Sequence, residues 1–334
     1  MERPLWIDRH APTLEDLPQA EVGERLQNAV SEPVNLVLQG PIGSGKTAAV
    51  RALADAAHED PEADLVEINV ADFFGMTKKE LTQDPRFARF ISAKRRRESS
   101  KADLINYVLK ESASYPPVSG SYNTILLDNA EAIREDFQQA LRRVMEQYHQ
   151  ATQFVIATRQ PTKLIPPIRS RCVPVAVRAP TEDEIVSVLR DIAAAEDVPF
   201  DDEGLGYVAS YAESNLRRAI LAAQTAAEKN GALEGIDVLD PLADVGLDDR
   251  IEEMLDAAED GSFSDARGVL DDLLVDEGLT GEEVLEEILR VARTRYNGDR
   301  LPEIYRSAGD VDFDLTHGTS ARIHLGRFLA ELGA

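Results

Sequence analysis

The chain has 334 residues, of which 43% are hydrophobic and 29% charged, and this balance excludes an intrinsically disordered protein. Its formal net charge of −25, taken alone, argues against a nucleic-acid binder, because phosphates are contacted by Lys and Arg. No stretch approaches the ~18 consecutive apolar residues of a membrane span, and the N-terminus lacks the apolar core of a secretory signal. We therefore expect a cytoplasmic protein without membrane contact.

The acidic residues are spread over nearly every helical stretch, which indicates the solvated acidic surface of a halophile protein. The segment from Met76 to Lys110 departs from this pattern, because it holds ten basic residues against four acidic ones. An exposed helix of unimportant charge and a contact with nucleic-acid phosphates are both compatible with the segment. Under the second interpretation, its candidate DNA-binding residues are Lys94, Arg95, Arg96 and Arg97.

Five short apolar runs, rich in β-branched residues, alternate with helical patterns along the first half of the chain. Such runs predict the strands of a parallel sheet that is buried on both faces. They occupy residues 34–38, 65–70, 124–128, 154–158 and 173–177. The sequence therefore predicts an α/β domain over residues 1–179.

The rest of the chain shows helical patterns only. Thr181 is a plausible N-cap with Glu184 as its capping-box partner, and it opens a predicted helical lid domain over residues 180–235. A stretch rich in Gly, Asp and Pro then indicates a linker. Four amphipathic patterns follow within a predicted all-α domain over residues 240–334, and they cover residues 251–258, 263–274, 281–296 and 321–333. Their periodicity is equally compatible with a simple helical bundle and with an oligomerisation collar.

The segment from Gly40 to Thr47 follows the first predicted strand and leads into a helix. It has the G-x-x-x-x-G-K-[ST] pattern of a phosphate loop in its proper setting, so we expect it to bind ATP with Mg²⁺. Lys46 would neutralise the β- and γ-phosphates, and Thr47 would ligate the magnesium ion. The candidate cofactor-binding residues of the loop are Gly40, Pro41, Ile42, Gly43, Ser44, Gly45, Lys46 and Thr47.

Asp128 ends the third apolar run, where its carboxylate can hold magnesium through water opposite Thr47. A strand-end aspartate that caps the next helix is the alternative. Hydrolytic members of this nucleotide-binding class have a Glu at the next position, where this chain has Asn129. An amide cannot accept a proton, so position 129 is a degenerate catalytic position. Glu131, two residues further on, is expected to point elsewhere if the strand ends at Asp128.

Four further segments resemble the family of replication factor C small subunits, and these subunits are AAA+ ATPases. They are LWIDRHAPTLEDL, EINVADFFG, DFQQALRRVMEQYHQATQFVIATRQPTKLIPPIRSRC and NLRRAI, and their order and spacing cover nearly the whole chain. The resemblance implies a P-loop AAA+ parallel-sheet domain, a helical lid and an all-α collar. It also implies a clamp-loader subunit that works in a heteropentamer with other small and large subunits. That complex loads the PCNA sliding clamp onto primer-template DNA during replication.

The resemblance carries roles to individual residues. Arg171 of the Ser-Arg-Cys triplet matches the arginine finger that reaches the ATP of a neighbouring subunit, for which a planar guanidinium is suited. A surface salt bridge is the alternative for Arg171. Arg217 matches the lid sensor that touches the nucleotide in cis, and Pro12 and Thr158 are further candidate nucleotide contacts. The remaining candidates, for DNA or intersubunit contacts, are Arg142 and Arg143.

Three residues depart from the family pattern: Asn129, Arg159 and Ala11 stand where the family has Glu, Asn and Arg. Together they suggest a subunit that binds ATP, hydrolyses it slowly or not at all, and still donates Arg171 to a neighbour. The alternatives are an active ATPase subunit in which Glu131 or a water network compensates, and a non-catalytic scaffold of the loader. A different AAA+ DNA-processing motor, such as a Holliday-junction motor, is the remaining alternative.

Phe73 and Phe74 are adjacent aromatic residues just before the basic segment. They have two interpretations: side chains of the core, or a docking surface for the clamp. No segment resembles a terminal clamp-binding peptide, so primary clamp anchoring is assigned to a different, larger subunit.

Overall fold

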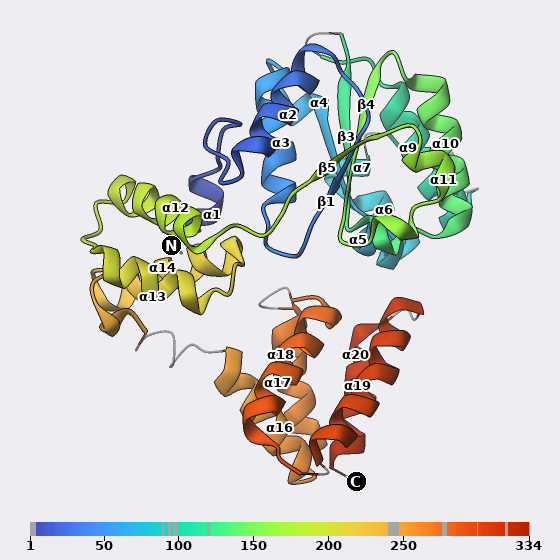
Figure 1. The fold of residues 1–334 in the computed structure, drawn as a ribbon. Helices are drawn as coiled ribbons and strands as arrows, with labels where there is room; N and C mark the ends of the chain where they lie inside the picture. The colour runs from blue at the N-terminus through green and yellow to red at the C-terminus, as the bar shows by residue number, and fades with distance from the viewer. Residues whose placement is uncertain are drawn as a thin grey trace. The chain divides into compact units, whose positions relative to one another are not determined.

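The structure is a computed structural model that describes residues 5–88, 90–92, 95, 99–118, 121–239, 247–275, 279–298, 300–317 and 320–333. The chain forms two compact units, Met1–Val238 and Leu239–Ala334, and each is described by itself (Figure 1). Among the described residues, no helix has the length and apolar character that a membrane crossing needs.

A five-stranded parallel sheet forms the centre of the first unit. Its order is β2-β3-β4-β1-β5, so β1 lies between β4 and β5. All five predicted strands are present, with ends shifted by at most two residues. The bounds are β1 (Leu36–Gln39), β2 (Leu65–Asn69), β3 (Asn123–Asp128), β4 (Thr152–Thr158) and β5 (Val173–Ala176).

Helices cover both faces of this sheet, as the near-continuous apolar strands predict. Leu36 and Leu38 of β1 pack into the core on one side, whereas Val37 packs into the core on the other. Helices α2 and α3 lie on the first face, and α9 and α10 on the second (Figure 1). The bounds are α1 (Trp6–Arg9), α2 (Ala20–Ser31), α3 (Lys46–Ala57), α4 (Pro61–Asp64), α5 (Val70–Gly75), α6 (Lys78–Gln83), α7 (Pro85–Ala88), α9 (Lys101–Ser114), η1 (Ala130–Ala132), α10 (Glu135–Tyr148), η2 (Pro161–Lys163) and α11 (Pro166–Arg169).

The two adjacent aromatic residues pack inward. Phe73 is 1% exposed and meets Phe87 with ring centroids 4.8 Å apart, while the half-buried Phe74 meets Phe137 at 5.1 Å. Edge-to-face contacts of this kind belong to a packed core. The core interpretation is therefore confirmed for these two side chains.

The lid helices follow the sheet as predicted. The Thr181 hydroxyl accepts from the Glu184 N–H, and Glu184 Oε2 accepts from the Thr181 N–H at 2.7 Å, so the predicted capping box is confirmed. Because both orphan donors are satisfied, this helix begins at Glu182. The bounds are α12 (Glu182–Ala195), α13 (Asp202–Tyr211), α14 (Leu216–Asn230) and η3 (Ile236–Leu239).

The second unit is helical and has its own apolar core. Four of its helices match the predicted amphipathic patterns, but α19 was not among them. Pro302 in its first turn and Gly309 in its middle are poor helix formers, which hid its pattern. Packing of Ile304, Ala308 and Val311 into the core compensates. The bounds are α16 (Leu247–Glu259), α17 (Phe263–Val275), α18 (Gly281–Arg295), α19 (Arg300–His317) and α20 (Ala321–Leu332).

Candidate functional site

The phosphate loop connects β1 to α3 and requires glycine at several positions. Gly43 and Gly45 have backbone φ angles of +67° and +90°, which residues other than glycine rarely adopt. A Cβ on Gly40 would lie 1.9 Å from the Val177 carbonyl oxygen. The predicted loop therefore has the tight backbone that lets its N–H groups and the start of α3 face an anion.

Lys46 lies inside this loop. Its Nζ donates to the carbonyl oxygens of Gly40 at 2.9 Å and Pro41 at 2.6 Å. Burial lowers the pKa of Lys46 below its ordinary 10.5, and the charges of Asp128 and Glu131 oppose this shift. The charges of these two carboxylates favour the protonated, cationic form of Lys46. A cation is therefore placed where the phosphates would enter.

Thr47 and Asp128 meet across 81 positions of sequence. The Thr47 hydroxyl donates to Asp128 Oδ2 at 2.7 Å. A hydroxyl and a carboxylate are hard oxygen ligands, and such a pair fits Mg²⁺ that keeps several of its waters. The donor set therefore suits the nucleotide-bound magnesium that the sequence predicts. Ser44 adds a buried hydroxyl with no hydrogen-bond partner among the described residues.

Asn129 follows directly in a left-handed conformation with φ +51°. Its backbone N–H donates to Asp128 Oδ1 at 2.9 Å, so the turn helps to orient that carboxylate. Asn tolerates this conformation better than most residues, because its short polar side chain bonds locally. The position where a hydrolytic site has Glu is thus held by an amide in a turn.

Glu131 is directed at the neighbouring end of β4, in keeping with the expectation that it does not take the place of the missing Glu at position 129. Its carboxylate accepts from the Thr158 hydroxyl at 2.8 Å and from Arg159 Nε at 2.7 Å. Burial raises the pKa of Glu131, but the hydrogen bonds from Arg159 and Thr158 outweigh it and hold the pKa below its ordinary value. The turn after β3 is short, so Glu131 in η1 lies beside the neighbouring end of β4 and contacts Thr158 there.

The lid meets the phosphate loop at the start of α14. The Leu216 N–H donates to the Gly43 carbonyl oxygen at 3.0 Å, and Asn215 packs so closely that a Cβ on Gly43 would lie 2.0 Å from its Oδ1. Arg217 is the next residue and is exposed. It makes no hydrogen bond or ion pair with any described residue, so its guanidinium is available to a ligand.

The N-terminal segment is attached to the same loop by a residue that sequence reasoning missed. Gln19 is 2% exposed, and its Nε2 donates to the carbonyl oxygens of Ser44 at 3.1 Å and Arg178 at 2.8 Å. Pro12 lies half-buried earlier in this segment. A glutamine has no distinctive motif, and only the fold brings Gln19 beside the phosphate loop.

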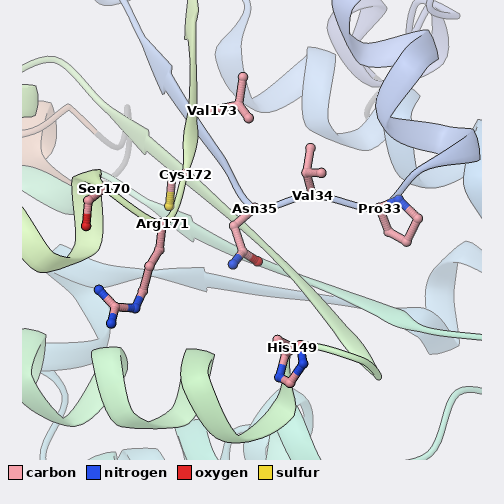
Figure 2. Close-up of a pocket in the computed structure, with 8 residues that line it drawn as sticks. All are labelled: Pro33, Val34, Asn35, His149, Ser170, Arg171, Cys172 and Val173. Carbon is pink, nitrogen blue, oxygen red and sulfur yellow. The ribbon is translucent and has the colours of Figure 1, made fainter.

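Arg171 and the phosphate loop lie at opposite ends of the parallel strands: Arg171 at the amino ends, and the loop at the carboxyl ends. Arg171 precedes β5, whose first residue Val173 pairs with Leu36 at the start of β1, whereas the loop follows the end of β1. Its Nη2 donates to Glu146 of α10 at 2.5 Å, and its side chain is 38% exposed. Arg171 lines a pocket of about 380 Å³, which Figure 2 draws in close-up. The residues that line this pocket are Pro33, Val34, Asn35, His149, Ser170, Arg171, Cys172 and Val173.

The candidate DNA contacts are described in part. Lys94, Arg96 and Arg97 lie outside the described residues. Arg95 is exposed, with its guanidinium 4.5 Å from the Tyr107 ring centroid. On α10, Arg143 is exposed, while Arg142 is half-buried and its Nε has no hydrogen-bond partner among the described residues.

Known proteins match both units of the chain. The family model "ATPase family associated with various cellular activities (AAA)" matches residues 36–178, and "Replication factor C C-terminal domain" matches residues 247–331. The replication factor C small subunit of Staphylothermus marinus is 32% identical over 98% of this chain and 94% of its own length. The chain belongs to the replication factor C small-subunit family.

Further replication factor C small subunits match along nearly their whole length. That of Methanococcus maripaludis strain C6 is 28% identical over 100% of this chain and 99% of its own. That of Halobacterium salinarum is 28% identical over 98% of this chain and 95% of its own. These relatives confirm the predicted family and, with it, the predicted role as a nucleotide-binding subunit of a replication factor C clamp loader.

Solved structures share the fold. The RuvB Holliday junction branch migration motor of Thermotoga maritima has a TM-score of 0.51 and 17% identity, and the match covers 82% of this chain and 87% of the motor. A point mutant of that motor gives a TM-score of 0.51 at 16% identity, covering 87% and 91%. At such identity the likeness shows the fold alone, and it confirms the predicted AAA+ parallel-sheet class.

Proposed function

We propose that this chain is a replication factor C subunit whose own ATP site is catalytically quiet and whose Arg171 completes the ATP site of a neighbour. The observation that carries the proposal is the position of Arg171 at the edge of the sheet opposite to its own phosphate loop. The four residues of β1 alone separate these edges by roughly 13 Å, at about 3.3 Å per residue. A phosphate that meets Arg171 therefore belongs to another molecule.

The pairing of Arg171 with Glu146 agrees with this role. Both side chains are well exposed, at 38% and 43%, so the ion pair is solvent-screened and contributes at most about 1 kcal/mol. A γ-phosphate carries more negative charge than one carboxylate and offers several oxygens to a guanidinium. Exchange of Glu146 for a neighbour's phosphate thus needs little free energy. The surface salt bridge and the arginine finger are two states of one side chain.

The quiet site rests on Asn129. Bound ATP and Mg²⁺ would supply the polarised γ-phosphate, with Lys46 placed for the phosphates and Thr47 and Asp128 placed for the ion. Asn129 offers no carboxylate to take a proton from an attacking water. Gly40 to Gly45, Thr158 and Pro12 complete the proposed nucleotide contacts. Arg217 reaches the nucleotide from the lid.

Hydrolysis with Glu131 as the compensating base is not favoured. Both oxygens of Glu131 already accept hydrogen bonds from Thr158 or Arg159, and its pKa is held below its ordinary value. A carboxylate with a lowered pKa is a weaker base, and this one is also fixed in place. Glu131 would have to leave Arg159 before it could serve.

The partners are part of the proposal. They are the other small and large subunits in a heteropentamer, the PCNA clamp and primer-template DNA, with a cytosolic location. Residues 1–179 would bind the nucleotide, residues 180–235 would act as the lid and residues 240–334 as the collar. Arg142, Arg143 and the run from Lys94 to Arg97 would contact DNA phosphates, whose binding weakens steeply with salt.

Reconstitution of the complete loader tests this proposal. The sibling subunits are assembled with and without this chain, and loading of PCNA onto primed circular DNA is measured with ATP and Mg²⁺. We expect loading to require this chain. Complexes with Lys46→Arg, which keeps a cation in the loop, should retain more loading activity than complexes with Arg171→Ala. Full loading without this chain would contradict the proposed role.

A further inference from the structure

Gln19 occupies the N-cap position of α2, but its side chain makes no capping hydrogen bond to that helix. Helix N-caps are usually Ser, Thr, Asp or Asn, whose short side chains accept from the first turn. The Gln19 amide instead donates to two backbone carbonyl oxygens, that of Ser44 in the phosphate loop at 3.1 Å and that of Arg178 at 2.8 Å. Its polar group therefore serves the phosphate loop and not its own helix.

The amide of Gln19 has a single arrangement. Its NH2 group has two hydrogens and two carbonyl oxygens accept from it, so the partners determine its orientation. Arg178 lies between β5 and the lid helix α12, and its guanidinium donates to Glu21 of α2 at 3.0 Å and to Glu184 of α12 at 2.6 Å. Because Arg178 is itself held on both sides, it fixes Gln19 in the direction of Ser44.

The Ser44 carbonyl belongs to the same peptide group as the Gly45 N–H. A trans peptide is planar, so its C=O and N–H point in opposite directions. A phosphate loop turns its N–H groups toward the anion, and the Ser44 carbonyl oxygen then lies on the far side, where Gln19 meets it. A hydrogen bond accepted by the carbonyl also polarises the peptide and makes its N–H a stronger donor. Gln19 therefore acts on both the direction and the strength of one N–H in the loop.

We propose that Gln19 is a positioning residue of the nucleotide site, which fixes the peptide between Ser44 and Gly45 so that its N–H meets the β-phosphate. Glycine at positions 43 and 45 gives the loop its tight turns but leaves the backbone there with much conformational freedom. Gln19 supplies the restraint from the side away from the nucleotide. This inference rests on the proposed nucleotide site and adds to it a residue that governs phosphate affinity without touching the ligand.

Equilibrium binding of ATP and of ADP to the full chain tests this inference, with calorimetry as the readout. Gln19→Met keeps the length of the side chain and removes both donors. We expect it to bind each nucleotide about 5- to 10-fold more weakly, the range of one hydrogen bond, because both nucleotides have the β-phosphate. The loss should be the same with Mg²⁺ and with EDTA, since Gln19 acts through the loop and not through the ion.

Gln153→Met is the matched control. Gln153 is also 2% exposed, and its Nε2 donates to the carbonyl oxygens of Ala29 at 3.3 Å and Val34 at 3.1 Å. It lies near the amino end of β4, whereas the phosphate loop follows the carboxyl end of β1. Both variants lose two buried hydrogen bonds and should have lower melting temperatures. Only Gln19→Met should bind nucleotides more weakly at a temperature at which both variants are folded, and an equal loss in the two would overturn the positioning role.

Gln19→His carries the test where Gln19→Met does not fold. At about pH 8 the imidazole is neutral and keeps one N–H donor at a similar reach. We expect ATP and ADP to bind this variant about 2- to 3-fold more weakly than wild type, between wild type and Gln19→Met. Wild-type affinity in every folded Gln19 variant would overturn the inference.

The outcomes separate this inference from the nucleotide site itself. Lys46→Ala should weaken the binding of both nucleotides, and a wild-type chain that binds neither would contradict the proposed function. A wild-type chain that binds both, together with Gln19 variants that bind both equally well, would overturn the role of Gln19 alone.

Discussion

The Thr47 hydroxyl donates a hydrogen bond to Asp128 Oδ2 over 2.7 Å and so joins the start of α3 to the end of β3. Parallel strands place their carboxyl ends at one edge of the sheet, and the loop after β1 meets the residues after β3 there. The two oxygens are the proposed magnesium ligands. Their contact ties magnesium binding to nucleotide binding in one place.

The first prediction concerns Asp128. Asp128→Asn keeps the shape of the side chain but removes the charge that a magnesium ion and its waters would meet. We expect ATP affinity with Mg²⁺ to fall by roughly 10-fold, while ATP affinity with EDTA stays unchanged. Fluorescent-nucleotide titration under both conditions measures this. A loss of equal size without magnesium would show that Asp128 supports the loop and not the ion.

The second prediction concerns Asn129. Asn129→Glu introduces the missing carboxylate, and we expect own-site ATP turnover to rise by about 10²-fold, the lower range for a positioned general base. Because the residue has φ +51°, the longer side chain should also lower stability by about 1 kcal/mol. Asn129→Gln is the matched control, with the same strain and no carboxylate. Equal turnover in the two variants would remove Asn129 as the reason for a quiet site.

The third prediction separates strain from contact in the phosphate loop. Gly43→Ala and Gly45→Ala both impose a left-handed conformation on alanine, at φ +67° and +90°. Only the first also clashes, since its Cβ would lie 2.0 Å from Asn215 Oδ1, whereas Gly45 has nothing within 4 Å. We expect Gly43→Ala to lower ATP affinity more, because it pushes α14 away from the loop.

The shorter residue in Asn215→Ser should relieve that clash and keep an N-cap for α14. The double variant Gly43→Ala with Asn215→Ser should therefore recover part of the lost ATP affinity. The same second change should leave Gly45→Ala unimproved. Equal recovery in both backgrounds would show that Asn215 does not act through its contact with Gly43.

The fourth prediction follows from the lowered pKa of Glu131. A carboxylate with a lower pKa in the folded than in the unfolded chain stabilises the fold above its ordinary pKa and loses that effect as pH falls through the folded value. Glu131→Gln should thus be less stable than wild type at neutral pH. The difference in unfolding free energy should shrink below about pH 4.5. A constant difference across this range in denaturant titrations would contradict the ionised pair.

Much of this account is contained in local sequence patterns. The phosphate loop, Asp128 and the five strands follow from spacing and apolar periodicity, because each depends on neighbouring residues. The Thr181 capping box is local in the same sense. The α19 helix was missed, since Pro302 and Gly309 weaken its local signal and only the packing of its apolar side chains in the collar core supports it.

The site residues that sequence reasoning missed are those that the fold brings together. Gln19 reaches the Ser44 carbonyl oxygen, and Asn215 reaches Gly43, over separations that no spacing rule covers. The partners of Glu131 could not be predicted, because the direction of its side chain depends on the turn at Asn129 and on the neighbouring strand β4. Tertiary contacts of this kind have no signature within a single segment of sequence.

The most direct test of the central claim is ATP turnover by the reconstituted loader with clamp and primed DNA, comparing Lys46→Ala and Arg171→Ala in this subunit. Arg169→Ala, a neighbouring exposed arginine, is the control for surface charge. We predict that Lys46→Ala leaves most turnover intact, because this subunit's own site is quiet, while Arg171→Ala cuts it by about 10³-fold at the adjacent site. Loss of turnover with Lys46→Ala, together with little effect of Arg171→Ala, would contradict the account.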